Sequence, residues 1–329
     1  MAHKTPKEPD ARPLLARTWA VAVLAGISCL LWGSAPAAIK FGYVLFGIAV
    51  TDVGSIILFA GCRFVLAGLI ALALGSLLAG RPRLPKRGSL GMVVRLSLFQ
   101  TVGQYVCYYV GVANTSGVKS AIIVSLNTFF SIAIAALVFR QERLTGRKVL
   151  GCALGICGVA LVNLTGAGLD ASMTWHGEGM VAASALMYSL SSVLVSRYSK
   201  HEDPVALSGG QFLVGGALMV AIGLALGGHL ASISTAGLGN LVYLGFVSGV
   251  AYSLWALLLA HNPVSRVSVF GSMNPVFGVM LSATLLGETN VVPAWRCALA
   301  LGLVVGGICV VNAAGRKTVA GHDPITRKA

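Results

Sequence analysis

Long apolar stretches alternate with short polar connections along the whole chain. A helix of about 20 apolar residues crosses the hydrocarbon layer of a bilayer while making all of its backbone hydrogen bonds internally. The pattern therefore predicts an all-α membrane protein with ten transmembrane helices. The predicted spans are 18–39, 54–79, 90–112, 117–139, 147–163, 178–197, 204–227, 237–260, 265–286 and 294–314.

The composition indicates that the lipid bilayer is the main partner of the chain. Of the 329 residues, 56% are hydrophobic and only 10% are charged, whereas a soluble domain carries roughly 25% charged residues. All seven cysteines lie inside apolar stretches, which argues against a disulfide framework. Because no spacing of cysteine, histidine or acidic residues is typical of a metal or cofactor site, we expect no cofactor.

The basic residues give the chain a net charge of +14 and lie in short clusters between the apolar stretches. A nucleic-acid surface would gather them on one face, so we expect no nucleic acid partner. Lys and Arg in short loops stay on the cytoplasmic side of a membrane. They concentrate in the tails 1–17 and 315–329 and in the loops 81–87 and 140–148, whereas the connection 164–177 holds none. Both termini are therefore predicted to be cytoplasmic.

The second half of the chain repeats the first. A shift of 147 residues pairs Tyr105 with Tyr252 and aligns the segment 125–130 (SLNTFF) with 272–277 (SMNPVF). Each half holds an odd number of predicted spans, so the second copy enters the membrane from the opposite side. Inverted repeats are characteristic of transporters, whose solute site lies between the copies near the midplane. The predicted parts are a cytoplasmic tail at 1–17, a five-helix repeat at 18–163, an external connection at 164–177, a second five-helix repeat at 178–314 and a cytoplasmic tail at 315–329.

Several segments resemble one transporter family. Residues 30–40 (LLWGSAPAAIK) resemble its first-helix signature, and Arg63 and the segment 142–151 (ERLTGRKVLG) resemble later landmarks. With the five-plus-five layout, the chain is similar to the EamA-like transporters of the drug/metabolite transporter superfamily over residues 18–314. The resemblance implies passage of metabolites or amino acids across a bacterial cytoplasmic (inner) membrane. It also implies a central cavity lined mainly by the first, third and fourth helices of each half.

Polar and aromatic side chains inside the spans are the candidates for contact with a solute. Polar groups are costly in lipid and tend to face a cavity or a partner helix. A spacing of four places Gln100, Gln104 and Tyr108 along one face of the third span. The predicted substrate-binding residues are Trp32, Gln100, Gln104, Tyr108, Asn127, Tyr188, Tyr252, Trp255 and Asn274. For the repeat-related pair Asn127 and Asn274, hydrogen bonds that only join helices are the alternative role.

Four basic residues are candidates for binding charge or for gating: Lys40, Arg63, Lys119 and Arg266. Arg63 lies well inside its span, where it pairs either with a substrate carboxylate or, as a structural anchor, with the carbonyl groups at helix C-termini. Lys119 and Arg266 stand at matching helix starts, where extension of the side chain to the membrane interface is the alternative.

The predicted function is a secondary transporter, preferably an exporter, of small organic metabolites by alternating access. Amino acids, other carboxylate-bearing solutes and polar neutral solutes are the expected classes. No Asp or Glu lies in the middle of a predicted span, which disfavours a proton-coupled drug exporter, because exporters of cationic drugs use a membrane carboxylate. That exporter is the alternative, and a membrane-embedded enzyme or a scaffold is a more distant one. The chain carries no catalytic motif, so we predict that it is not an enzyme. A homodimer is left open.

Overall fold

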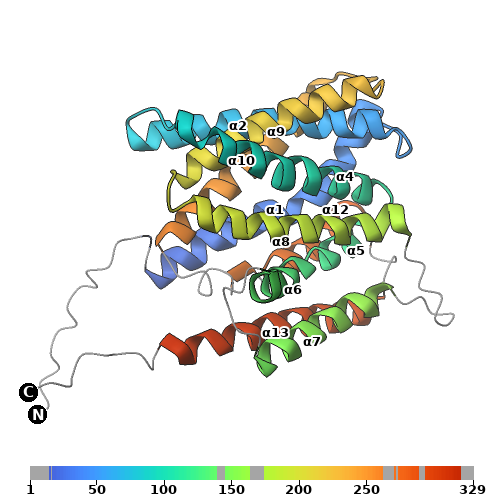
Figure 1. Ribbon diagram of the computed structural model, residues 1–329. Helices are drawn as coiled ribbons and strands as arrows, with labels where there is room; N and C mark the ends of the chain where they lie inside the picture. The colour runs from blue at the N-terminus through green and yellow to red at the C-terminus, as the bar shows by residue number, and fades with distance from the viewer. Residues whose placement is uncertain are drawn as a thin grey trace, which may run out of the picture.

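The computed structural model describes residues 15, 17–138, 145–163, 174–261, 270–271, 273–288 and 293–319. Regular structure in these residues is helical throughout (Figure 1). The α-helices are α1 (Thr18–Phe46), α2 (Val53–Ala79), α3 (Leu90–Leu96), α4 (Gln104–Ala113), α5 (Gly117–Ile123), α6 (Leu126–Ala133), α7 (Gly146–Asn163), α8 (Met180–Tyr198), α9 (Pro204–Ala225), α10 (Thr235–His261), α12 (Met273–Leu285) and α13 (Ala294–Val319). A 3-10 turn (Arg87–Ser89) and three π-helical segments (Ser97–Gly103, Ile134–Val138 and Trp175–Gly179) complete the elements.

In the described residues, each predicted apolar span coincides with one helix or with consecutive helices. The largest differences are at two helix ends. α1 continues to Phe46 because the chain stays apolar after Lys40, and it ends at Gly47, whose φ of 65° closes the helix. α13 continues to Val319, into the predicted tail 315–329. The rest of that tail and most of the tail 1–17 lie outside the described residues.

Five helical segments in the described part of the chain are long and apolar enough to cross a bilayer. They are Trp19–Phe46, Val53–Ala79, Trp175–Val195, Pro204–Ala225 and Thr235–Leu258, with mean hydropathies from 1.4 to 2.4. The helices Met273–Leu285 and Ala294–Gly307 are apolar but shorter. Length and composition together make this chain a multi-pass membrane protein.

α2 and α9 form a closely packed antiparallel pair along the upper edge of the bundle in Figure 1. Glycines recur every seven residues on both helices, at 54, 61, 68 and 75 on α2 and at 209, 216 and 223 on α9. A Cβ added at Gly61 would lie 2.5 Å from the backbone N of Val220, and one added at Gly216 would lie 2.6 Å from the backbone N of Val65. The backbones touch because these positions have no side chain.

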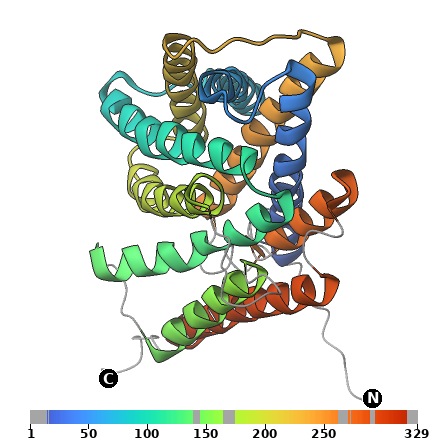
Figure 2. The ribbon, with the colours of Figure 1, turned by 90° about the vertical axis from the view of Figure 1, so that its right-hand side faces the viewer.

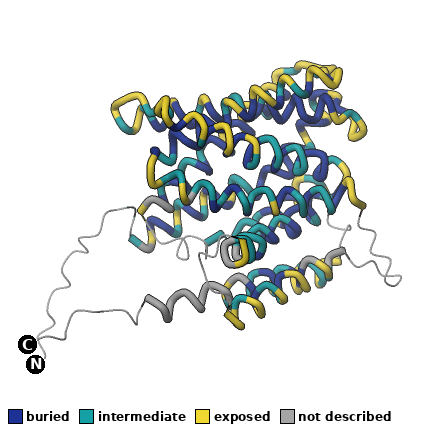
Figure 3. The backbone as a smooth tube through the Cα atoms, viewed as in Figure 1, coloured by how far each residue is buried: buried dark blue, intermediate teal, exposed yellow. Residues whose placement is uncertain are grey.

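α7 and α13 form a second close pair on the opposite side of the bundle (Figure 2). A Cβ on Gly158 would lie 2.8 Å from the carbonyl oxygen of Ala300, and a Cβ on Gly307 would lie 2.5 Å from that of Gly151. Exposed residues follow the outer side of this pair (Figure 3). Glycine therefore brings two helix backbones together at both edges of the molecule.

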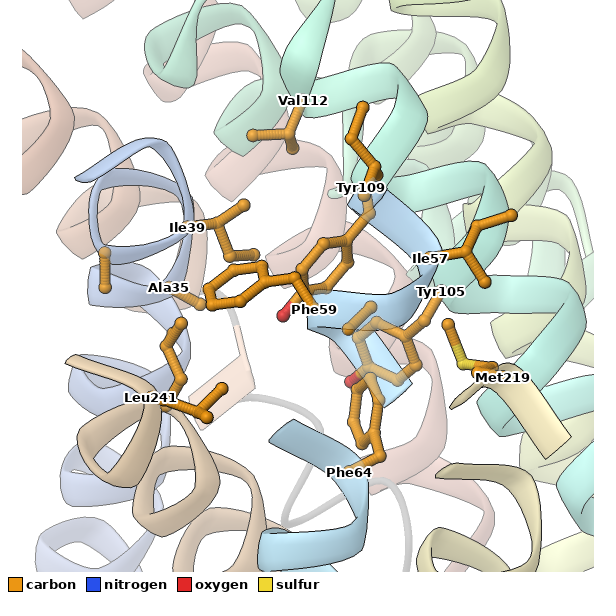
Figure 4. Close-up of a cluster of buried hydrophobic side chains, with 14 of the residues drawn as sticks. Ala35, Ile39, Ile57, Phe59, Phe64, Tyr105, Tyr109, Val112, Met219 and Leu241 are labelled. Atoms are coloured by element: carbon orange, nitrogen blue, oxygen red, sulfur yellow. The ribbon is translucent and has the colours of Figure 1, made fainter. Parts of the chain in front are cut away.

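The helices between these two pairs enclose the main core. α1 packs on α10 and α12, and α8 packs on α4, α5 and α6. Aromatic side chains of α2 and α4, among them Phe59, Phe64, Tyr105 and Tyr109, lie against aliphatic residues of α1 and α10 (Figure 4). This core lies at the level where the two halves of the chain contact each other.

Candidate functional site

Two tyrosines at equivalent positions of the two halves meet in the centre of the bundle. Tyr105 of α4 and Tyr252 of α10 are 147 residues apart, and their hydroxyl groups share a hydrogen bond of 2.7 Å. Phe64 of α2 and Phe212 of α9, also equivalent, stack beside them with ring centroids 5.3 Å apart. Residues that touch their own repeat counterparts lie where the halves meet, so these rings mark that interface.

Further predicted site residues gather around Tyr252. Trp32 of α1 packs with ring centroids 5.1 Å from Tyr252 and 5.2 Å from Trp255. The side chain of Gln104 lies beside the hydroxyl of Tyr252, and Tyr188 of α8 is close to it. We call these residues the central cluster: Trp32, Gln104, Tyr105, Tyr188, Tyr252 and Trp255.

The central cluster holds two polar atoms that have no hydrogen-bond partner among the described residues. They are the indole N–H of Trp32 and the Oε1 atom of Gln104, whose residue is only 8% exposed. A buried polar atom without a partner costs about 1–3 kcal/mol. One donor and one acceptor of the cluster are therefore left unsatisfied by the described residues.

Gln100 does not join the central cluster. The π-helical segment Ser97–Gly103 places an additional residue in the turn, so Gln100 leaves the face expected from a spacing of four. Its Oε1 accepts a hydrogen bond of 2.6 Å from Nε2 of Gln211 in α9. Tyr108, one position before Tyr109, packs between the main core and the core around α5.

Asn127 and Asn274 each lie on a helix that contacts the first long helix of the opposite half. Ser189 of α8 donates a hydrogen bond of 2.9 Å to the carbonyl oxygen of Asn127. Cys29 of α1 lies beside the backbone of Asn274. The Oδ1 atom of Asn127 has no hydrogen-bond partner among the described residues.

Arg63 is fully enclosed by α2, α4 and α10, with 1% of its surface exposed. Its guanidinium donates hydrogen bonds of 3.1 Å to the carbonyl oxygen of Leu244, 2.5 Å to the hydroxyl of Tyr109 and 2.8 Å to the hydroxyl of Ser248. It also lies 5.0 Å from the ring centroid of Phe64. Within the described residues its partners are neutral, and they join three helices.

An open hollow of about 660 Å³ lies at one end of the bundle. Its walls include Lys40, Thr115, Lys119, Thr174, Glu178 and Glu288. We call it the outer hollow, because the predicted topology puts these helix ends on the side away from the cytoplasm. Two of the predicted charge candidates, Lys40 and Lys119, therefore share one hollow.

Each lysine of the outer hollow faces one carboxylate. The Nζ of Lys119 lies 3.1 Å from Oε1 of Glu178, and the Nζ of Lys40 lies 3.6 Å from Oε1 of Glu288. The carboxylate of Glu288 also accepts hydrogen bonds from the backbone N–H groups of Gly117 and Val118 at the start of α5. The fourth predicted charge candidate, Arg266, lies outside the described residues.

Sequence reasoning missed three residues of these networks. Tyr109 and Ser248 hold Arg63, and Glu178 holds Lys119. A signal existed for Glu178, which is an acid at the start of an apolar stretch. For Tyr109 and Ser248 the partners come from other helices, so the linear pattern carries no signal.

Comparison with known proteins identifies relatives over most of the chain. The model of the EamA-like transporter family matches residues 19–164 and 175–313. A probable amino-acid metabolite efflux pump of Salmonella typhimurium is 27% identical over 247 residues, which cover 71% of this chain and 78% of that protein. An inner membrane transporter of Escherichia coli that is itself uncharacterised, YedA, is 25% identical and covers 86% of this chain and 87% of its own length.

A solved crystal structure has the same fold. It superposes with a TM-score of 0.63 at 20% identity and covers 90% of this chain and 98% of that chain. The family model matches the two halves of the chain separately, and the relatives are named as transporters or efflux pumps. This membrane transporter belongs to the EamA-like transporter family of the drug/metabolite transporter superfamily.

Proposed function

We propose that the protein exports small organic metabolites across the bacterial inner membrane by alternating access. Amino acids and other carboxylate-bearing or polar neutral solutes are the proposed classes. The proposed architecture has ten transmembrane helices in two inverted five-helix repeats, 18–163 and 178–314, with both termini in the cytoplasm. Rocking of one repeat against the other would open the interface between them to each side in turn.

The pairing of helices supports the inverted repeat. α2 and α9 occupy equivalent places in the two halves and pack antiparallel, as do α7 and α13. α1 packs on α10 and α12, and its counterpart α8 packs on α4 and on the α5–α6 pair. These main contacts of one half are thus matched by counterparts in the other, as expected for a two-fold axis in the membrane plane.

The observation that carries the transport proposal is the central cluster. It lies where the repeat-related residues Tyr105 and Tyr252 meet, which is the position that inverted-repeat transporters use for their solute. It combines aromatic faces with hydroxyl, amide and indole groups, of which Trp32 and Gln104 each hold an atom without a partner in the described part of the chain. Such a lining suits a small molecule that has both apolar and polar parts.

The charges support the solute class. The central cluster contains no carboxylate, and the acidic side chains of the described residues lie at helix ends, as Asp52, Glu178, Asp203 and Glu288 do. A lipophilic cation would lack a counter-charge at the centre. A zwitterion or a neutral polar solute needs only the donors and acceptors that the cluster offers.

Counterflow in proteoliposomes tests the proposal. Purified protein is reconstituted with unlabelled solute inside, and uptake of labelled amino acids, carboxylates, sugars and a tetraphenylphosphonium-like cation is followed. We expect exchange of at least one amino acid or carboxylate, abolished when Trp32→Ala and Gln104→Ala are combined. Uptake of the cation alone, driven by a pH gradient, would overturn the proposal in favour of a proton-coupled drug exporter.

A second test separates a transporter from a scaffold. Asn127→Ala and Asn274→Ala should lower flux while the amount of protein in the membrane stays normal, because each asparagine lies on a helix that contacts the opposite half, where the proposed cycle separates the halves. Ser253→Ala is a matched control, since among the residues that the structure describes the Ser253 hydroxyl bonds only to the carbonyl oxygen of Gly249 in its own helix. Equal flux in all three variants would contradict a role for the asparagines.

A further inference from the structure

Lys40 of α1 and Lys119 of α5 both line the outer hollow. Among the described residues, the hydrogen-bond acceptors of the hollow are occupied, whereas the lysines keep unused donors. We propose that this hollow is a binding site for the carboxylate group of the solute, held between the ammonium groups of Lys40 and Lys119. The inference rests on the proposed transport function and adds a second, outer station to the central cluster. It assigns the two lysines a shared ligand.

The acceptors of the hollow are already occupied. Oε1 of Glu178 accepts from the Thr115 hydroxyl at 2.8 Å and from Lys119 at 3.1 Å. Its Oε2 accepts from the backbone N–H of Thr174 at 3.1 Å and from the Thr174 hydroxyl at 3.3 Å. The carboxylate of Glu288 accepts two backbone N–H bonds of 3.1 and 3.0 Å at the start of α5. An incoming ammonium group would therefore have to displace existing bonds.

The donors of the hollow are not used up in the same way. A lysine ammonium carries three N–H groups, and among the described residues Lys119 uses one of them, on Glu178. Lys40 lies 3.6 Å from Glu288, which is beyond hydrogen-bonding distance, so its ion pair is loose. The lysine side chains are 15% and 25% exposed, against 5% and 13% for Glu178 and Glu288. Both lysines thus line the open space and keep donors that the described residues do not use.

This imbalance selects the chemistry of the ligand. Free donors with positive charge bind a carboxylate, whereas the carboxylates of the hollow are turned toward the protein backbone and hydroxyls. The ion pairs keep the hollow close to neutral when it is empty, so a bound carboxylate gains partial and not full attraction from each lysine. Weak binding suits a station that solute must leave in each cycle.

The experiment measures transport from each side of the membrane. Right-side-out and inside-out vesicles report the half-saturating concentration of the best-transported carboxylate of the panel, together with its amide analogue. Lys119→Gln should raise the outer half-saturating concentration by about tenfold, because a charge-assisted hydrogen bond is lost. Lys40→Gln should raise it by about threefold, since its side chain is more exposed. The inner value and the values for the amide should stay within about twofold in both variants.

Three variants separate binding from structure. Lys119→Arg keeps the positive charge and should retain the wild-type outer value. Lys86→Gln removes a lysine from a loop at the other end of the bundle and is the matched control, because its bond to Glu202 comes from the backbone N–H. Glu178→Gln keeps Lys119 but weakens its ion pair, so it should lower the outer half-saturating concentration or leave it unchanged. A purely structural role for the Lys119–Glu178 pair predicts equal losses in Lys119→Gln and Glu178→Gln, on both sides and for both solutes.

The outcomes distinguish this inference from the proposed function. Wild-type transport of a carboxylate with unchanged outer values in both lysine variants overturns the inference and leaves the transporter standing. A preference for the amide over the carboxylate in the wild type also overturns it. Absence of any flux across the panel overturns both. Selective loss on the outer side, for the carboxylate only, supports it.

Discussion

The α2–α9 pair and the central cluster are both built from equivalent positions of the two halves, yet they differ in what fills the contact. Between α2 and α9 the contact is made by glycines whose missing side chains let the backbones touch. In the central cluster it is made by aromatic rings and polar groups, and two buried polar atoms have no partner among the described residues.

We interpret the α2–α9 pair as a scaffold and the central cluster as the proposed solute site. A backbone contact without side chains has few alternative packings, so the α2–α9 pair should stay closed while other helices move. Partnerless atoms of the kind found in the central cluster destabilise a fold unless something binds there. In the proposed transport cycle, the glycine contact would therefore hold the two halves together and the polar central cluster would lie where they separate.

The largest effect is expected from a substitution that pushes α2 and α9 apart. Gly61→Ala places a methyl group where only 2.5 Å separates it from the backbone N of Val220, so we expect a destabilisation of about 3 kcal/mol. Thermal unfolding in detergent, followed by size-exclusion chromatography, measures it. Gly302→Ala is the matched control on α13, where nothing lies within 4 Å of an added Cβ. An unchanged melting temperature for Gly61→Ala would show that the pair tolerates separation.

A second, smaller effect is expected at Arg63, the buried cation of α2. Arg63→Met removes the donor to Leu244, Tyr109 and Ser248, so we expect a loss of about 2 kcal/mol in stability. The solute preference of the remaining folded protein should not change, because all three bonds go to the protein. A selective loss of carboxylate over amide transport in this variant would instead place Arg63 in the solute site.

The central cluster itself should respond in flux more than in stability. Tyr105→Phe removes one hydroxyl of the shared bond with Tyr252, so we expect about 1 kcal/mol of destabilisation and reduced flux. Adding Tyr252→Phe should cost little more, since the hydrogen bond between the two hydroxyls is already lost in the single variant and Tyr252 then keeps only its contact with Gln104. Additive losses in the double variant would mean that the two hydroxyls act separately.

The smallest effect is a pH dependence where the loop after α2 meets the loop before α9. Glu202 accepts backbone hydrogen bonds from Lys86 and Asp203. Burial raises the pKa of this carboxyl. Hydrogen bonds from Ser89, Asp203 and Lys86 together lower the pKa by more than burial raises it, so the folded pKa lies below the usual 4.5. A carboxyl of lowered pKa stabilises the fold above its unfolded pKa, and this contribution is lost as the pH falls through the folded pKa.

Melting temperatures therefore should fall below about pH 5 in the wild type. Glu202→Gln should begin at a lower value and show a shallower fall over the same range. Flux preferences should be the same in both proteins, because Glu202 lies on the scaffold side of the comparison. Identical pH profiles would mean that Glu202 does not contribute to the acid sensitivity.

Much of the fold was accessible from the sequence because it depends on hydrophobic length. The predicted spans coincide with the helices in the described residues, apart from end differences such as the extension of α1 to Phe46. The family followed from short motifs in a fixed order, and the family model confirms it. The inverted ten-helix topology and the position of the termini stay predictions.

The site was only partly accessible, because contacts between helices do not follow linear spacing. Trp32, Gln104, Tyr188, Tyr252 and Trp255 were selected as polar or aromatic residues inside spans, and the structure brings them together. Their role in binding a solute stays a prediction. Gln100 was selected by the same rule, yet a π-helical turn directs it to Gln211.

By itself the sequence determined that this chain lies in a membrane as apolar helices and that its second half repeats its first. Both properties follow from the period and length of local patterns, which are written into consecutive residues. Only the tertiary structure decided which repeat-related residues touch, that Arg63 is held by neutral groups, and that Lys40 and Lys119 share a hollow. These features depend on how helices that are far apart in the chain pack against each other. Glycine contacts and local π-helical turns determine that packing, and the spacing of residues along the chain does not predict it.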